Sequence, residues 1–275
     1  MAQIVAKRSL TEVTRLFTIK APLVARNAAP GQFVIIRVSE EGERVPISIT
    51  NFDRDEGTIT IVVQEVGKTS RMISALEVGD EILDFAGPLG LPAPLPESGH
   101  AVLIGGGFGA GAVYPLAREL HNRGVKVSAI VGARTEGLLI LRDLLEPACD
   151  EYHICTDDGS VGYKGFVTGR LEDLIVGGAG YTIAYAVGPM PMMRAIAAAT
   201  KPHGLKTMVS LDPIMVDGTG MCGACRVTID GKTRFACVDG PFFDAAGVDF
   251  DEAVVRSKMY AEEQKLATEL AAARS

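Results

Sequence analysis

The stretch AVLIGGGFGAGAVYPLARELHNRGVKVSAIVGAR, residues 101–134, decides the fold class of this chain. It begins with an apolar run that ends in glycines, continues with helical periodicity over 112–124, and closes with a second apolar run over 125–134. A strand, a helix and a second strand in this order predict a βαβ unit. Helix and strand patterns keep alternating afterwards, which predicts a parallel-sheet α/β domain over residues 98–205.

The residues before this unit predict an all-β domain. Short alternating or β-branched runs are separated by Gly, Pro, Asn and Asp, and they lie at 14–22, 31–40, 47–52, 57–66 and 81–87. Such runs favour a small barrel or sandwich over residues 1–97. Residues 206–250 hold a cysteine-rich loop, and residues 251–275 predict a charged terminal helix. The expected fold class is therefore all-β plus α/β with a small loop domain near the carboxyl end.

Composition excludes several classes of function. The formal net charge of −7 and the absence of clustered Lys and Arg argue against a nucleic-acid surface. Glycines interrupt the longest apolar run, and the first residues alternate charged with apolar side chains, so we expect neither a signal peptide nor a membrane span. Five cysteines are too few and too unevenly placed for a disulfide framework, which favours a reducing cytoplasm.

Two glycine loops are candidates for binding a dinucleotide. In IGGGFGAGA, a G-x-G-x-x-G/A pattern fits as Gly105, Gly107 and Ala110, between a buried strand and a helix that can hold a pyrophosphate at its N-terminus. A structural glycine turn is the alternative. The second loop, in YAVGPMPMMRA at 185–195, also joins a strand end to a helix of the same domain. Open α/β sheets bind ligands at such strand ends, which favours the binding interpretation.

The sequence VQEVGKTS, residues 63–70, contains the GKT of a nucleotide-phosphate loop. The full pattern requires a glycine five residues before Gly67, where this chain has Val62, so we do not expect an ATPase. Thr69 and Ser70 can still offer backbone and hydroxyl donors to a phosphate. An ordinary turn is the alternative.

The loop DGTGMCGACRVTIDGKTRFAC, residues 217–237, is a candidate metal centre. Cys222, Cys225 and Cys237 give C-x2-C-x11-C, and Asp217 lies where plant-type [2Fe-2S] loops have their first cysteine. A carboxylate can ligate iron, so these four residues form a complete ligand set. A zinc knuckle or three free thiols are the alternatives. Cys149 and Cys155 lack such partners and are expected to be buried thiols.

The order of these motifs resembles the ferredoxin-reductase superfamily. RVPIS at 44–48 and VGKTS at 66–70 precede GGGFGAG, GAR at 132–134, TDDGSVGYKGFVT at 156–168 and VGPMPMM at 187–193, and the cluster loop follows. Within the superfamily, the chain is similar to the branch of dihydroorotate dehydrogenase electron-transfer subunits. It is closer to small subunits of NADH-dependent reduced ferredoxin:NADP oxidoreductase, because the dihydroorotate branch has cysteine where this chain has Asp217.

The resemblance implies FAD on the barrel, NAD(H) as substrate on the α/β domain, and a [2Fe-2S] cluster in the loop. The FAD contacts that it implies lie in RVPIS, the next strand and the following turn: Arg44, Pro46, Ile47, Ser48, Val62, Val63, Gln64, Gly67, Thr69 and Ser70. RVPIS departs from the superfamily in one respect, since its arginine lies four residues before the serine instead of three. The implied dinucleotide contacts are Gly106, Gly107, Gly109, Gly188, Pro189 and Met190.

The implied function is electron transfer between NAD(H), FAD and the cluster, inside a complex whose larger flavin and iron–sulfur subunit bifurcates electrons and reaches ferredoxin and NADP(H). Cofactors carry this chemistry, so no catalytic acid or base is expected, and His121, Asp157 and Asp158 are assigned to helix-surface and turn roles. Two alternatives remain open. One is the electron-transfer subunit of dihydroorotate dehydrogenase, and the other is a non-catalytic nucleotide-binding module with structural zinc.

Overall fold

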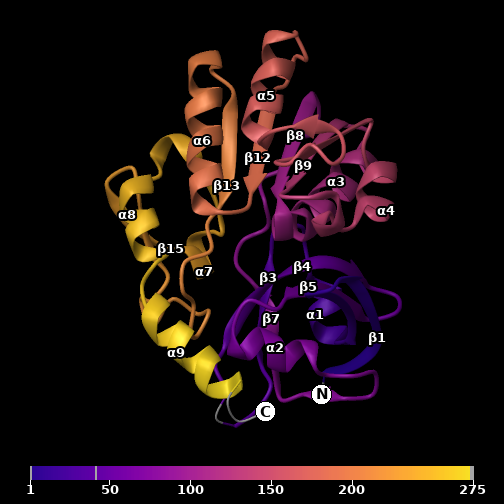
Figure 1. Cartoon of the computed structure of the whole chain (residues 1–275), viewed down its shortest axis with the longest axis vertical. Coiled ribbons are helices and arrows are strands. Elements are labelled where there is room, and N and C mark those ends of the chain that lie inside the picture. Colours follow the sequence, from indigo (N-terminus) through magenta and orange to yellow (C-terminus); the bar gives the residue numbers. More distant parts are fainter. Residues whose placement is uncertain (1, 41, 273–275) are drawn as a thin grey trace.

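The structure, a computed structural model, describes residues 2–40 and 42–272. A barrel built from the first residues lies at one end of the molecule and a parallel-sheet domain at the other (Figure 1). The carboxyl-terminal segment, coloured yellow in Figure 1, runs down one side from the parallel-sheet domain to the barrel. Within the described residues, no helix is both long enough and apolar enough to cross a bilayer.

The barrel is a seven-stranded antiparallel sheet with strand order β6-β1-β2-β5-β4-β3-β7. The strands are β1 (Ala2–Thr11), β2 (Thr14–Lys20), β3 (Phe33–Arg37), β4 (Val45–Asp53), β5 (Thr58–Gln64), β6 (Glu81–Ile82) and β7 (Asp84–Leu89). The two edge strands of this order, β6 and β7, are separated in sequence by Leu83 alone, so the chain itself nearly closes the barrel. The β-rich prediction for these residues is confirmed.

Alternation along the strands fills the barrel. In β4, Ile47 and Ile49 point into the barrel core while Pro46 and Ser48 are half-buried on the outer face. Helix α1 (Pro22–Asn27) contributes Val24 and Ala25 to this core, and α2 (Lys68–Ser74) contributes Ile73. Burial of these β-branched and aliphatic side chains stabilises the barrel at roughly 25 cal/mol per Å² of apolar surface removed from water.

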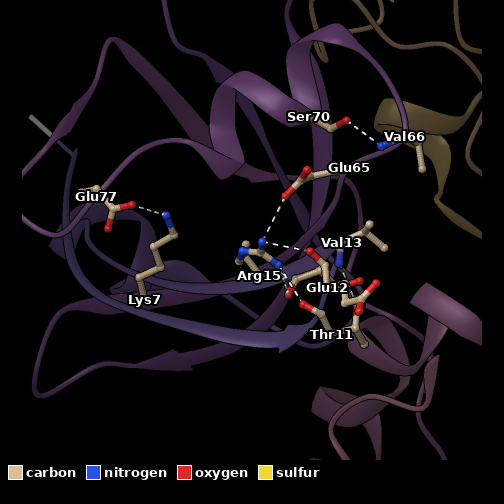
Figure 2. A network of polar contacts seen from close by, with 10 residues as sticks. Lys7, Thr11, Glu12, Val13, Arg15, Glu65, Val66, Ser70 and Glu77 are labelled. Atoms are coloured by element: carbon tan, nitrogen blue, oxygen red, sulfur yellow. Dashed lines mark hydrogen bonds and ion pairs between the residues drawn. The ribbon is translucent and has the colours of Figure 1, made fainter. Parts of the chain in front are cut away.

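A polar network fixes the segment that follows β5 (Figure 2). The guanidinium of Arg15 donates to the carbonyl oxygen of Thr11 at 2.8 Å and that of Glu12 at 3.0 Å, and lies 3.5 Å from the carboxylate of Glu65. Immediately after Glu65, the backbone N–H of Val66 donates to the hydroxyl of Ser70 at 2.9 Å. These contacts join the β1–β2 turn to the start of α2.

The second sheet has strand order β11-β10-β9-β8-β12-β13-β16, and all its neighbours are parallel except β16. Its strands are β8 (His100–Gly106), β9 (Lys126–Ala133), β10 (Glu151–Thr156), β11 (Tyr163–Lys164), β12 (Ile183–Val187), β13 (Lys206–Ser210) and β16 (Phe242–Asp244). The predicted parallel α/β architecture is confirmed. β13 and β16 come from residues that we assigned to the cluster segment, 206–250, so this segment also completes the edge of the sheet.

Helices cover both faces of this sheet. Helices α3 (Ala110–Asn122) and α4 (Arg142–Leu145) pack on one face, while α5 (Val167–Val176) and α6 (Met190–Thr200) pack on the other. Ala101 and Leu103 of β8 point toward α3, whereas Val102 and Ile104 point the other way. β8 is buried on both faces, which explains its continuous apolar run.

The carboxyl-terminal region adds a hairpin and short helices. Its elements are β14 (Arg226–Ile229), β15 (Lys232–Phe235), α7 (Ala236–Asp239), α8 (Phe250–Arg256) and α9 (Ala261–Ala272). The sequence predicted a single helix over 251–275, but the structure has two, separated by a turn in which Tyr260 has φ of 62°. A residue with positive φ cannot continue a right-handed helix. Residues 273–275 of the predicted helix lie outside the described residues.

The barrel and the sheet domain share one core. Leu16 and Val62 of the barrel pack with Val113 and Leu116 of α3, and Arg118 of the same helix bonds the side-chain oxygen of Asn51. Helix α3 therefore lies between the outer face of β4 and the parallel sheet, which fixes the position of its N-terminus against the barrel.

Candidate functional site

The two predicted dinucleotide loops meet at the switch point of the parallel sheet. β8 lies between β9 and β12, so the chain winds in opposite directions from it, and Val187 at the end of β12 pairs with Gly105 at the end of β8. Ligands bind at such switch points in open α/β sheets. The structure thus brings the two loops together at the edge where the sequence analysis expected them.

Close packing explains the glycines at this point. A Cβ on Gly109 would lie 2.0 Å from the carbonyl oxygen of Val187, and a Cβ on Gly106 would lie 2.3 Å from the sulfur of Met192. A Cβ on Gly188 would lie 2.6 Å from the terminal methyl carbon of Met192. At Gly109 the two backbones are in direct contact and leave no room for a side chain, whereas at Gly106 and Gly188 the side chain of Met192 fills the space.

The surface at the switch point is open to a phosphate. Gly107 has φ of 52°, and a Cβ there would meet nothing within 4 Å. A 3-10 turn over Gly107–Gly109 leads directly into α3, and the N–H of Ala110 already donates to the carbonyl oxygen of Gly107. The N–H groups that such a helical start leaves free for an anion are therefore those of Gly107, Phe108 and Gly109. Met190 is buried in the core, and only its backbone can contact a ligand. This donor arrangement fits the pyrophosphate of a dinucleotide.

The outer face of β4 lies beside the N-terminus of α3. Ser48 lines a narrow recess together with Ala112 of α3 and Phe242 of β16. Pro46 lies on the same outer face, while the side chain of Ile47 is 8% exposed and points into the barrel. Pro46 and Ser48 can therefore offer side chains to a flat ring system, and Ile47 can offer only its backbone.

In β5, which is predicted to border the flavin, mainly backbone atoms are accessible to a cofactor. Val62 is 1% exposed and packs under α3, whereas Val63 is 2% exposed and points into the barrel core. Gln64 is half-buried at the end of β5. Neither valine side chain is accessible to a cofactor, because alternation places them in the two cores that flank this strand.

The predicted phosphate turn has its hydroxyl groups engaged by the protein. The Thr69 hydroxyl donates to the carboxylate of Glu43 at 2.6 Å, and the Ser70 hydroxyl accepts from the N–H of Gly67 at 2.9 Å. Gly67 caps the start of α2, so backbone N–H groups are the donors that remain there. Arg44 is exposed just before β4. Sequence reasoning missed Glu43, whose carboxylate anchors the turn.

The four predicted cluster ligands fall into two pairs. The sulfur atoms of Cys225 and Cys237 lie 3.1 Å apart and both residues are buried, while the carboxylate of Asp217 accepts from the N–H of Cys222 at 2.8 Å. Cys222 itself is exposed. Among residues 2–40 and 42–272, no three potential ligand side chains converge on one point, so the two pairs are separate.

Electrostatics differ between the two pairs. The pKa of Asp217 lies below its usual value because the N–H groups of Thr219 and Cys222 donate to its carboxylate. Burial, together with the neighbouring Cys225 sulfur, raises the pKa of Cys237 to about 12. Deprotonation of two buried thiols in contact needs a compensating cation, which a metal ion supplies on binding. The donor set therefore fits a thiolate-bound metal centre.

The cluster loop rests on the barrel next to the predicted flavin strand. A Cβ on Gly218 would lie 2.7 Å from the Cδ1 atoms of both Ile35 in β3 and Leu89 in β7. Ile35 pairs across the sheet with Pro46. Gly218, adjacent to Asp217, is thus separated from Pro46 by one strand. Sequence reasoning missed Ile35 and Leu89, since an apolar strand residue carries no local sign of a long-range contact.

The side chains assigned to structural roles are at the surface or in a turn of the parallel-sheet domain. His121 is exposed in the last turn of α3. The carboxylate of Asp158 accepts from both the N–H and the hydroxyl of Ser160, which stabilises the turn after β10. Burial raises the pKa of Cys155 to about 11, as expected for a buried thiol.

Comparison with known proteins identifies the family of the two ends of the chain. Residues 1–92 match the oxidoreductase FAD-binding domain, and residues 212–249 match the iron–sulfur cluster binding domain of dihydroorotate dehydrogenase B. The electron-transfer subunit of dihydroorotate dehydrogenase B from Geobacillus thermodenitrificans is 35% identical over 254 residues, which cover 89% of this chain and 96% of the relative. This chain belongs to the family of the dihydroorotate dehydrogenase B electron-transfer subunits and their homologues.

Other members of this electron-transfer-subunit family are more similar to the chain. A homologue of the same subunit from Thermotoga maritima is 43% identical over 267 residues, covering 97% of this chain and 94% of the relative. A chain in a solved structure of NADH-dependent reduced ferredoxin–NADP oxidoreductase superposes with a TM-score of 0.93 at 41% identity, covering 98% of this chain and 97% of that one. The family resemblance expected from the motifs is confirmed.

The chain is accordingly a ferredoxin-reductase-like flavin and iron–sulfur oxidoreductase subunit with an FAD-binding domain and an iron–sulfur cluster binding domain. Electron transfer is the function that these two domains fit, and NAD(H) is the substrate expected for this fold. Its homologues are subunits of heteromeric complexes, so a larger partner subunit is supported.

Proposed function

We propose that this chain is the subunit of an electron-bifurcating complex that reacts with NAD(H). It would pass electrons between NAD(H), FAD and a [2Fe-2S] cluster held by Asp217, Cys222, Cys225 and Cys237. A larger flavin and iron–sulfur subunit would reach ferredoxin and NADP(H). The observation that carries the proposal is the contact of Gly218 with Ile35, because it sets the cluster loop one strand from Pro46 on the predicted flavin face.

The protein's contribution is to position groups and exclude water. When bound, the flavin accepts a hydride and releases single electrons, which is chemistry that no side chain here supplies. Pro46 and Ser48 would support the ring system on β4, and the turn Gly107–Gly109 that leads into α3 would hold the pyrophosphate of NAD(H) beside it. Fixed backbone donors at the switch point hold the substrate without a charged side chain.

The two ligand pairs match the two irons of a [2Fe-2S] cluster. Cys225 and Cys237, already in contact, would hold one iron, and Asp217 with Cys222 would hold the other. The lowered pKa of Asp217 keeps its carboxylate charged, as a ligand must be. The free state of all five thiols also agrees with our proposal of a cytoplasmic location.

Two observations favour the ferredoxin–NADP type of complex over dihydroorotate oxidation. The superposition on that oxidoreductase covers nearly the whole of both chains, and Asp217 stands where the dihydroorotate branch is expected to have cysteine. The dihydroorotate alternative is supported by the 43% identity to the Thermotoga maritima homologue. Both alternatives use the same sites in this chain and differ in the partner.

The test is reconstitution of the purified chain with each candidate large subunit. We expect flavin absorbance, iron and sulfide at about two each per chain as a [2Fe-2S] site requires, NADH oxidation with an artificial acceptor, and ferredoxin-coupled transhydrogenation with the matching partner. Dihydroorotate oxidation in place of transhydrogenation would reassign the complex. A colourless chain, or one that holds zinc without iron, would contradict the proposal itself.

A further inference from the structure

A second cavity lies beside the cluster loop. Its volume is about 240 Å³, and it is enclosed by residues 213–214, the cluster loop, the β14 strand and the turn between α8 and α9. Cys222 forms one wall and Tyr260 another. None of the sites described above uses this cavity, although a proposed cluster ligand borders it.

Two guanidinium groups line the cavity. Arg256, in the last turn of α8, donates through Nη2 to the carbonyl oxygen of Ala224 at 2.9 Å, which holds its guanidinium against the loop. Its Nε is buried and has no hydrogen-bond partner among the described residues. Because this Nε has almost no accessible surface, any contact of Arg256 with a ligand in the cavity must come from the outer guanidinium nitrogens.

Arg226, the first residue of β14, is the second guanidinium and is exposed. Its Nη1 lies 3.4 Å from the carbonyl oxygen of Gly223, which directs it along the loop. Across the hairpin, Arg226 pairs with Phe235 whereas Val227 pairs with Arg234. Because cross-strand partners share a face, Arg234 lies on the opposite face of the hairpin from Arg226.

The cavity holds positive charge without a carboxylate. No Asp or Glu lines it, and within residues 2–40 and 42–272 neither Arg226 nor Arg256 belongs to an ion pair. In contrast, Arg194 on nearby α6 is paired with Asp251 of α8 at 2.8 Å. The wall of the cavity therefore carries positive charge in a chain whose net charge is −7.

We propose that this cavity binds a small oxyanion, a phosphate or a carboxylate, between Arg226 and Arg256, and that the bound anion lowers the reduction potential of the neighbouring cluster. Guanidinium groups bind oxyanions through paired, charge-assisted hydrogen bonds. Positive charge near a cluster stabilises its reduced, more negative form, and an anion offsets that charge. The second part rests on the proposed function, because it requires the cluster at Cys222.

The first test measures binding of inorganic phosphate to the full chain by calorimetry at constant ionic strength. We expect saturable binding with one site per chain, and about tenfold weaker binding in Arg226→Gln, as loss of a charge-assisted hydrogen bond implies. Arg226→Lys keeps the charge and should recover part of the affinity. Arg234→Gln is the matched control, since it removes the same charge from the other face of the hairpin and should bind phosphate normally.

The second test is a redox titration of the cluster signal, with and without phosphate, on the same variants. We expect a shift to more negative potential in the parent chain and in Arg234→Gln, and none in Arg226→Gln. Equal phosphate binding by Arg226→Gln and Arg234→Gln would overturn the site. Normal binding with an unmoved potential would overturn the coupling, whereas a chain that binds phosphate but holds no iron would contradict the proposed function and leave the binding site supported.

Discussion

The switch point of the parallel sheet and the cluster loop prepare for their ligands in different ways. At the switch point, Gly106, Gly109 and Gly188 are fixed by direct packing against Val187 and Met192, so the backbone surface exists before any ligand arrives. In the cluster loop, the groups that bind are side chains. One pair, Cys225 and Cys237, is in contact and buried, while Cys222 is exposed.

The switch point therefore binds through backbone donors, and the cluster loop binds through side-chain ligands. Backbone donors held by a packed sheet tolerate changes in neighbouring side chains but no added Cβ. Side-chain ligands in a loop depend on the identity of each residue, and their geometry is completed by the metal, because metal binding and folding are coupled. The following predictions test this contrast, from the largest expected effect to the smallest.

The largest effect is expected from Cys237→Ala. Loss of one of the two buried thiols leaves the iron that they share with a single protein ligand, so the cluster should be lost and iron should fall from about two per chain to near zero. Iron and sulfide analysis measures this. Cys155→Ala, which removes another buried thiol far from the loop in sequence, should keep its iron; equal loss in both variants would mean that the effect is general destabilisation.

At the switch point, Gly109→Ala should destabilise the fold itself. Its Cβ would lie 2.0 Å from the carbonyl oxygen of Val187, so the two loops must separate. We expect a loss of about 3 kcal/mol in the free energy of unfolding, at the upper end for overpacking, together with weaker NADH binding. Chemical denaturation measures the first. Gly137→Ala, where a Cβ meets nothing within 4 Å, is the control, and equal stability of the two variants would contradict the packing argument.

Two substitutions of Asp217 test whether its carboxylate is a cluster ligand or only holds the conformation of the loop. Asp217→Cys keeps an anionic ligand, so we expect the cluster to survive with a changed absorption spectrum and potential. Asp217→Ala removes the ligand and also the acceptor for the N–H groups of Thr219 and Cys222, so cluster content should fall. Absorption and electron paramagnetic resonance spectra measure both. An unchanged spectrum in Asp217→Ala would show that Asp217 is not a ligand.

The smallest expected effect is a loss of stability of the parallel-sheet domain at acid pH. Burial lowers the pKa of His100 below its ordinary value near 6.5, and its ring contacts the carbonyl oxygen of Ala179 and the hydroxyl of Ser128. The unfolded chain then takes up the proton first, so stability should fall as pH drops below about 6.5 and level off below the folded pKa.

Replacement of His100 by Gln should remove this part of the pH dependence. Denaturation at pH 7.5 and pH 5.5 measures it, and His153, whose pKa burial also lowers, should keep a weaker slope in the variant. An identical pH dependence in the parent and His100→Gln would exclude this histidine as a source. The iron content should be the same in both chains at neutral pH, since His100 lies in β8 and not in the cluster loop.

Local patterns predicted much of the architecture. The βαβ unit over 101–134 was recognisable because periodicity and a terminal glycine are properties of short windows. The single terminal helix was not correct, since the turn at Tyr260 has no Gly or Pro to signal it. Likewise, the contribution of Phe242–Asp244 to the parallel sheet could not be predicted, because pairing with β13 joins segments more than thirty residues apart.

For the candidate site, the sequence by itself determined the chemistry and the tertiary structure decided the arrangement. The ligand types, their D-x4-C-x2-C-x11-C spacing and the glycine loops are encoded locally, and they pointed to an iron–sulfur flavoprotein subunit. Only the folded chain showed that Val62 and Val63 are buried in two cores, that Gly218 rests on Ile35, and that Arg226 and Arg256 face one cavity. These contacts join distant segments, and close packing, which selects them, has no signature in a local stretch of sequence.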